Sequence, residues 1–139
     1  MISYHGTSSS DAAHIVAGNV SVILGGGELG RGFYTGEQLH LAKAWAFNRY
    51  GHKARNVVEF DVPDPVFFAL KVGPLDGREA TLMRGHIRNR DETRTYLFGY
   101  DVVWSQIVGS TSVNGDQYKW ESDKSEKLLN GAPCSRRVI

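Results

Sequence analysis

The sequence predicts one domain of the α+β class, on its length, its composition and the order of its apolar patterns. A chain of 139 residues has the size of a single domain. Hydrophobic residues make up 41% of the chain and aromatic residues 11%, which is typical of a folded globule. Short apolar runs alternate with helical patterns, and neither a repeat nor a linker interrupts them. Residues 1–139 are therefore expected to form one domain, with 130–139 as a loose tail.

The beginning of the chain predicts a strand, a short helix and a glycine-rich connector. Residues Ile2–His5 have the pattern of a short strand. A helix is expected over 11–17, with Ser10 or Asp11 as its N-cap. The triple glycine Gly25–Gly27 is interpreted as a flexible connector, because it lacks the lysine and the serine or threonine of a phosphate-binding P-loop.

The middle of the chain predicts a long helix followed by two strands. Residues 37–50 carry the strongest helical pattern, and Thr35 and Gln38 at its start have the spacing of a capping box. Strands are expected over 57–62 and 66–70, separated by a Pro-Asp-Pro break.

The last part of the chain predicts two strands, with one helix before them and one after them. A helix is expected over 76–90 and a short one over 125–129. Residues 101–108 form a nearly continuous apolar run and are therefore expected as an interior strand. Another strand is expected over 117–121.

The strand expected over 117–121 has two chemically different faces. Because side chains alternate across a strand, Tyr118 and Trp120 share one face, while Gln117, Lys119 and Glu121 share the other. Two interpretations follow. The strand is an amphipathic edge strand with its polar face in solvent, or its polar face lines a cleft.

Charge and composition exclude several functional classes. The formal net charge is +1, so bulk charge does not indicate a nucleic-acid partner. The arginines between 84 and 94 are interpreted as an exposed helix face, and the alternative that they bind an acidic target or a nucleic-acid backbone stays open. The five histidines show no ligand-pair spacing, so no metal site is expected, and zinc least of all. The single cysteine, Cys134, cannot form an internal disulfide, which fits a reducing compartment.

The sequence predicts no targeting or membrane segment. The first residues lack a basic region followed by an apolar run, so no signal peptide is expected. No stretch approaches the length of a membrane span, so no membrane partner is expected either. These observations predict a cytoplasmic protein, or one delivered into the cytoplasm of a target cell.

Two short motifs near the start of the chain carry a family resemblance. The first is Tyr4–Thr7 (Tyr-His-Gly-Thr), at the end of the opening strand, and the second is Gly30–Thr35 (Gly-Arg-Gly-Phe-Tyr-Thr), before the long helix. With a late strand that begins at Gln117, they resemble the ADP-ribosyltransferase superfamily. The resemblance is closest to the diphtheria-toxin and poly(ADP-ribose) polymerase branch, whose three motifs supply a histidine, a tyrosine and usually a glutamate. Small bacterial toxin-like members of that branch can have glutamine at the third position.

The resemblance implies a fold and a set of ligand-binding residues. The fold would consist of split antiparallel sheets around an NAD cleft, with flanking helices. NAD would be the co-substrate, without a metal. The ribose would be held by His5, the nicotinamide amide by the Gly6 backbone and the nicotinamide ring by Tyr34. Thr7, Arg31 and Gly32 would complete the NAD-binding set, with Arg31 approaching the pyrophosphate. Phe33 alternates away from Tyr34 and is expected in the core.

The resemblance also implies a catalytic set of His5, Tyr34 and Gln117. Cleavage of the bond between nicotinamide and ribose builds positive charge on the sugar, which a glutamate would stabilise by charge and by a hydrogen bond. Gln117 can supply only the hydrogen bond. Glu121 lies on the same strand face but about 13 Å further along, so it would instead orient the target group.

The implied function is that of a mono-ADP-ribosyltransferase, similar to a toxin or effector. It would transfer ADP-ribose from NAD to a macromolecular acceptor, a protein rather than a nucleic acid, and a cognate antitoxin or inhibitor is a further expected partner. Two alternatives stay open. The neutral Gln117 also fits a weak or inactive module that binds NAD or ADP-ribose, and an RNA 2′-phosphotransferase would share a related fold and use NAD.

Overall fold

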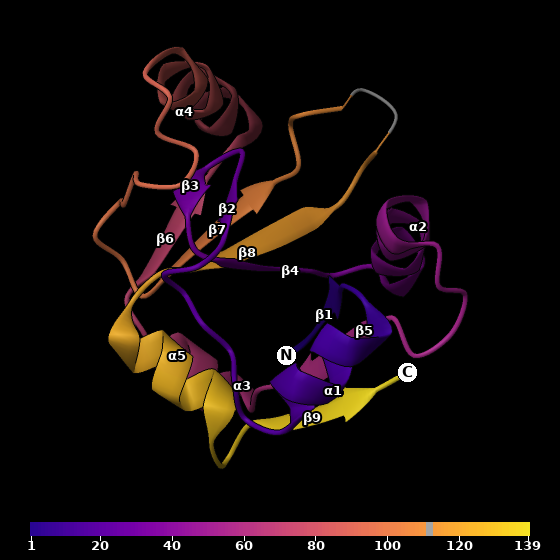
Figure 1. Cartoon of the computed structure of the whole chain (residues 1–139). Coiled ribbons are helices and arrows are strands. Elements are labelled where there is room, and N and C mark those ends of the chain that lie inside the picture. Colours follow the sequence, from indigo (N-terminus) through magenta and orange to yellow (C-terminus); the bar gives the residue numbers. More distant parts are fainter. Residues whose placement is uncertain (111–112) are drawn as a thin grey trace.

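The computed structural model of the chain describes residues 1–110 and 113–139, and it shows a mostly antiparallel sheet with helices on its sides (Figure 1). The expected α+β class is therefore confirmed. The helices are α1 (Ser9–Val16), α2 (Leu39–Tyr50), α3 (Asp64–Phe68), α4 (Gly77–Asn89) and α5 (Asp123–Asn130). The strands are β1 (Ile2–Gly6), β2 (Gly26–Gly27), β3 (Gly30–Arg31), β4 (Phe33–Gly36), β5 (Val57–Asp61), β6 (Val72–Leu75), β7 (Val102–Gln106), β8 (Asp116–Trp120) and β9 (Ser135–Val138).

The main sheet has seven strands in the order β6-β7-β8-β4-β1-β5-β9, and β2 pairs separately with β3. Only β6 and β7 run parallel in the main sheet. The ladder is continuous, but β1 and β4 pair through a single register position, Tyr4 opposite Gly36. The expected pair of split sheets is therefore not found, because the two sets of strands, β6-β7-β8-β4 and β1-β5-β9, are joined through this position into one sheet.

Local sequence explains where most helices begin. Ser8 caps α1 by accepting from the backbone of Asp11, so this helix begins before the expected cap. Asp76 and Glu79 form a reciprocal capping box at α4. The capping box expected at α2 is wrong, because Thr35 lies in β4 and the N-cap residue, Gln38, makes no capping bond with its side chain.

Two expected elements have a different structure. The strand expected over 66–70 is wrong, because Asp64–Phe68 form the short helix α3, with a proline in its first turn. A short apolar run fits a buried helix as well as a strand, and here the preceding prolines favour the helix. The triple glycine is also more ordered than a connector, because Gly26 and Gly27 pair with β3 in a hairpin.

The expectation of a loose tail is wrong for 135–138, which form the edge strand β9. Val138 pairs with Val58, and Arg137 lies opposite Glu59, to which it is ion-paired. The polar composition of this segment hid the strand, since charged residues are what an exposed sheet edge carries.

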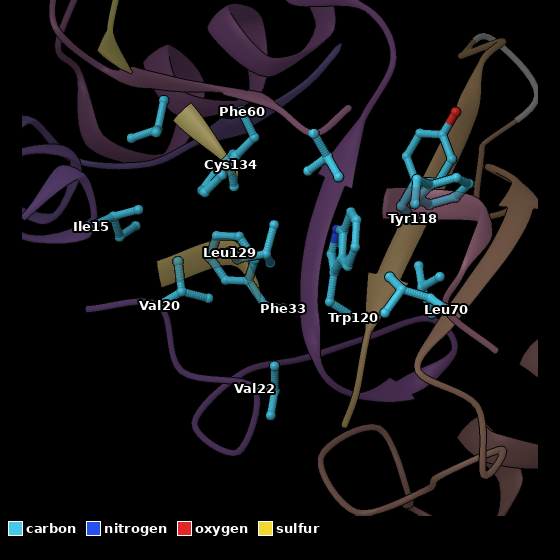
Figure 2. Close-up of a cluster of buried hydrophobic side chains, with 14 of the residues drawn as sticks. Ile15, Val20, Val22, Phe33, Phe60, Leu70, Tyr118, Trp120, Leu129 and Cys134 are labelled. Atoms are coloured by element: carbon cyan, nitrogen blue, oxygen red, sulfur yellow. The ribbon is translucent and has the colours of Figure 1, made fainter. Parts of the chain in front are cut away.

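The core lies where both halves of the sheet meet α1, α3 and α5 (Figure 2). Trp120 is fully buried there, and its indole N–H donates to Thr35 Oγ1 at 3.0 Å. Phe33 is 7% exposed and belongs to this core, as its position beside Tyr34 predicts. Ile15 of α1 and Leu129 of α5, both labelled in Figure 2, also belong to this core.

Strand β8 is an interior strand between β7 and β4, so its interpretation as an edge strand is wrong. Its polar face is buried: Gln117, Lys119 and Glu121 are at most 8% exposed. Lys119 Nζ donates to Glu121 Oε2 at 2.6 Å, and this contact opposes the burial that lowers the pKa of Lys119.

The carboxylate of Glu121 holds a loop rather than a target group. It accepts from the backbone N–H groups of Phe98, Gly99 and Tyr100 at 2.8–3.1 Å. Every favourable position around it is thus taken by protein donors. The role expected for Glu121 at the cleft is therefore wrong.

Across residues 1–110 and 113–139, no helix combines the length and apolar character needed to cross a membrane.

The packing of α2 on β1 gives a first prediction. A Cβ added at Gly6 would lie 2.2 Å from the backbone oxygen of Ala42, whereas one added at Gly85 on α4 meets nothing within 4 Å. Gly6→Ala should therefore lower the free energy of unfolding by about 1–3 kcal/mol or more, because backbone must move. The matched control Gly85→Ala should raise it by roughly 0.5–1 kcal/mol. Urea denaturation measures both, and equal effects would contradict this packing.

Candidate functional site

A cavity of about 900 Å³ opens where β1 and β4 separate. This is a volume typical of ligand sites in proteins. Its walls come from β1, the β2–β3 hairpin, β4, α2 and the β7–β8 connection. The cavity brings together five of the six expected NAD-binding residues and the whole expected catalytic set. These lining residues are His5, Gly6, Thr7, Gly32, Tyr34 and Gln117.

The imidazole of His5 has a defined protonation state and tautomer. Burial lowers the pKa of His5, and its hydrogen bond to the Tyr34 backbone opposes this only in part, so the ring is neutral near pH 7. Nδ1 lies 2.7 Å from the carbonyl oxygen of Tyr34, which can only accept, so Nδ1 carries the proton. The ring also stacks on Phe33 with centroids 4.2 Å apart. Nε2 therefore has a lone pair that can accept from a ligand hydroxyl.

The ring of Tyr34 is fixed at both its hydroxyl and its face. The hydroxyl donates to the carbonyl oxygen of Gly30 at 2.6 Å and accepts from the backbone of Leu29 at 3.2 Å. A Cβ at Gly27 would lie 2.7 Å from Tyr34 Cζ, so only glycine allows this close approach. Burial raises the pKa of Tyr34, so the hydroxyl stays protonated. The triple glycine thus supports an aromatic ring on the cavity wall.

Gln117 is held by two protein acceptors. Its Nε2 donates to Glu28 Oε1 at 2.5 Å and to the carbonyl oxygen of Gln106 at 3.3 Å. The backbone of Gln117 lies opposite Gly36 in the ladder between β4 and β8. This register puts Gln117 on the same sheet face as Tyr34, two positions along.

Glu28 is a cavity residue that sequence reasoning missed. Its side chain is 16% exposed, its Oε2 lies 3.5 Å from Arg84 Nε, and its Oε1 accepts from the backbone of Val108 at 3.0 Å. Arg84 is thus turned toward the cavity wall rather than belonging only to an exposed helix face. A possible signal was an acidic residue between the triple glycine and the second motif, but nothing in the sequence paired it with position 117.

The remaining expected residues have mixed positions. Gly6 lies against α2, and Thr7 is 4% exposed and donates its backbone N–H to Asn56 at 2.8 Å. Gly32 lines the cavity, and a Cβ added to it would lie 2.9 Å from Lys119 Cγ. Arg31 does not line the cavity as the described residues define it. Instead its charge acts on buried Lys119, and its backbone donates to Tyr96.

The cavity wall is acidic and aromatic. Among the described residues that line it are four carboxylates and no lysine or arginine. Trp45 and Tyr50 of α2 form an aromatic edge, and both are partly exposed. Such a wall suits flat rings and groups without excess negative charge. The four carboxylates are Asp11, Glu28, Glu37 and Asp116.

In comparisons with models of protein families and with curated proteins, the chain matches neither a family nor an individual protein. Within residues 1–110 and 113–139, no three histidine, cysteine, aspartate or glutamate side chains are grouped as metal ligands would be.

The neutral state of His5 predicts an acid-sensitive fold. Because the folded-state pKa of His5 lies below its usual 6.5, the unfolded chain binds more protons as the pH falls below that value. The contribution of His5 to stability should therefore be fully present above pH 6.5 and be lost as the pH falls toward the folded-state pKa. Urea denaturation of the parent and His5→Asn at a series of pH values measures this. The asparagine keeps a donor near Nδ1 but cannot titrate, so an identical pH dependence in the two proteins would contradict the assignment.

Proposed function

We propose that this chain is a mono-ADP-ribosyltransferase of the His-Tyr-Glu type, with an ADP-ribosyltransferase-like fold and Gln117 at the third position. One observation carries the proposal: His5, Tyr34 and Gln117, which lie far apart in the sequence, line the same cavity where β1 and β4 separate. The co-substrate would be NAD, and ADP-ribose would pass to a macromolecule in the cytoplasm of the producing cell or of a target cell.

The proposed reaction breaks the bond between nicotinamide nitrogen and the anomeric carbon of ribose. The bonding electron pair leaves with nicotinamide, which departs as a neutral molecule, and positive charge builds on the ribose. A nucleophilic atom of the acceptor then forms the new bond to that carbon and loses a proton to solvent or to a nearby base. When water is the nucleophile, the same step is NAD hydrolysis. The protein contributes by orienting NAD and stabilising the cationic sugar.

The chemistry of the cavity residues fits these tasks. The lone pair on His5 Nε2 can accept from a ribose hydroxyl, because Nδ1 carries the proton. The fixed ring of Tyr34 can stack on nicotinamide, which adds roughly 0.5–1.5 kcal/mol beyond burial. The acidic wall supports a neutral or basic protein segment as acceptor over a nucleic acid.

A second candidate is a module that binds NAD or ADP-ribose without turnover, and the observation that favours it is the neutral side chain of Gln117. Calorimetry with NAD beside a nicotinamide-release assay separates the two functions. An RNA 2′-phosphotransferase fits less well, because a polyanionic RNA would need more basic residues than NAD, and the described lining offers neither lysine nor arginine even to the pyrophosphate of NAD.

Alanine substitutions at the two motifs test NAD cleavage. His5→Ala and Tyr34→Ala should each lower nicotinamide release by at least about 100-fold, because the substrate loses its orientation. Circular dichroism should show both variants folded. Tyr34→Phe should keep most of the activity, since the stacking ring remains.

The matched control is Phe68→Ala, because this exposed aromatic residue lies on α3 and does not line the cavity. It should release nicotinamide at the parent rate. Unchanged release in both His5→Ala and Tyr34→Ala would reject the proposed site.

The acceptor can be found by labelling. Parent protein and Tyr34→Ala are incubated with NAD that is labelled in its adenosine part and with a cell lysate. A protein labelled only by the parent supports transfer to protein. Purification of the parent itself from the lysate would reveal a bound antitoxin or inhibitor. Label that appears only in nucleic acid would contradict the proposed acceptor class.

A further inference from the structure

The side-chain amide of Gln117 has both of its N–H groups directed at protein acceptors, Glu28 Oε1 and the carbonyl oxygen of Gln106. A primary amide offers two N–H groups and one carbonyl oxygen. If the amide were turned around, Oε1 would face two oxygens that cannot donate. The contacts therefore fix one orientation, in which Oε1 is the amide atom left to accept from a ligand in the cavity.

The carboxylate of Glu28 is itself engaged by protein on both oxygens. Oε1 accepts from Gln117 and from the backbone of Val108, and Oε2 faces Arg84 at 3.5 Å. The loop covers it closely, because a Cβ at Gly109 would lie 2.4 Å from Oε2. Glu28 is thus placed to act through Gln117 rather than on a ligand.

We propose that Glu28 is a positioning residue, which fixes and polarises the amide of Gln117 so that Oε1 accepts a ribose hydroxyl of NAD. The inference rests on the proposed function. A carboxylate at the N–H end of an amide increases the negative charge on its carbonyl oxygen, as in any cooperative hydrogen-bond chain. The pair thereby supplies part of the stabilisation that a glutamate at 117 would give. This stabilisation grows as the ribose becomes cationic, so it favours the transition state over bound NAD.

The experiment measures kcat and KM for nicotinamide release by the full chain. Glu28→Gln keeps the size of the side chain but removes its charge, and it should lower kcat roughly 10- to 100-fold while KM changes little. The matched control is Glu59→Gln. Glu59 is also a partly buried glutamate paired with an arginine, its side chain being 14% exposed against 16% for Glu28, but it does not line the cavity. This control should keep the parent kcat.

An exchange of the two side chains separates positioning from a merely structural role. Gln117→Glu alone puts the carboxylate at 117 in contact with that of Glu28. The two carboxylates would share one proton, and kcat should fall as the pH rises and this proton is lost. The charged and titratable groups that face this pair are Arg84 from α4 and Tyr34 from β4. In the double variant Glu28→Gln with Gln117→Glu, the amide N–H at 28 again faces a carboxylate, which is now at 117. It should recover at least the parent kcat and lose that pH dependence.

Each outcome decides one question. If the parent releases nicotinamide and Glu28→Gln keeps its kcat, or if the double variant shows only the product of the two single losses, the positioning role is wrong and the proposed function stands. If the parent neither releases nicotinamide nor binds NAD by calorimetry, the proposed function is wrong and the role of Glu28 falls with it. A specific loss in Glu28→Gln and recovery in the double variant support the inference.

Discussion

The single pairing position between β1 and β4 is the constraint on which the rest of the site depends. Beyond Tyr4 and Gly36 the two strands separate, and the cavity occupies the opening. The hydrogen bond from His5 Nδ1 to the carbonyl oxygen of Tyr34 spans the same opening and links the two motifs. This contact adds to the pairing of Tyr4 with Gly36, sets the tautomer of His5 and binds the backbone that carries the Tyr34 ring.

Much of the fold could be predicted because local patterns agree with it. The strand at Ile2, the helix before Gly51 and the helix after Asp76 follow from apolar periodicity and from end signals. The errors occur where local patterns are ambiguous. Residues 66–70 are too few for periodicity to separate strand from helix, and 135–138 pair only because β5 offers a free edge. Pairing partners of that kind are not encoded in a short window.

The candidate site could be predicted as far as its motifs reach. His5 and Tyr34 lie within short segments whose order is informative, and the cavity contains both. The supports of the site were beyond prediction, because they are long-range contacts. Glu28 and Gln117 are 89 positions apart, and the role of Gly27 depends on where the Tyr34 ring packs. The expected role of Glu121 is not supported for a related reason, since its carboxylate binds Lys119 inside the protein, and Arg31 does not line the cavity as the described residues define it.

The pairing of Glu28 with Gln117 also restricts how this protein can change during evolution. Gln117→Glu alone would make both residues acidic and bring two like charges together. Glu28→Gln alone would make both residues amides and remove the charge from the pair. Neither intermediate keeps one acid facing one amide, so exchanging the two side chains while keeping that arrangement takes a change at both positions. Among descendants of this chain, the two positions are therefore expected to vary as a pair, with one acid and one amide exchanged between the hairpin and the late strand.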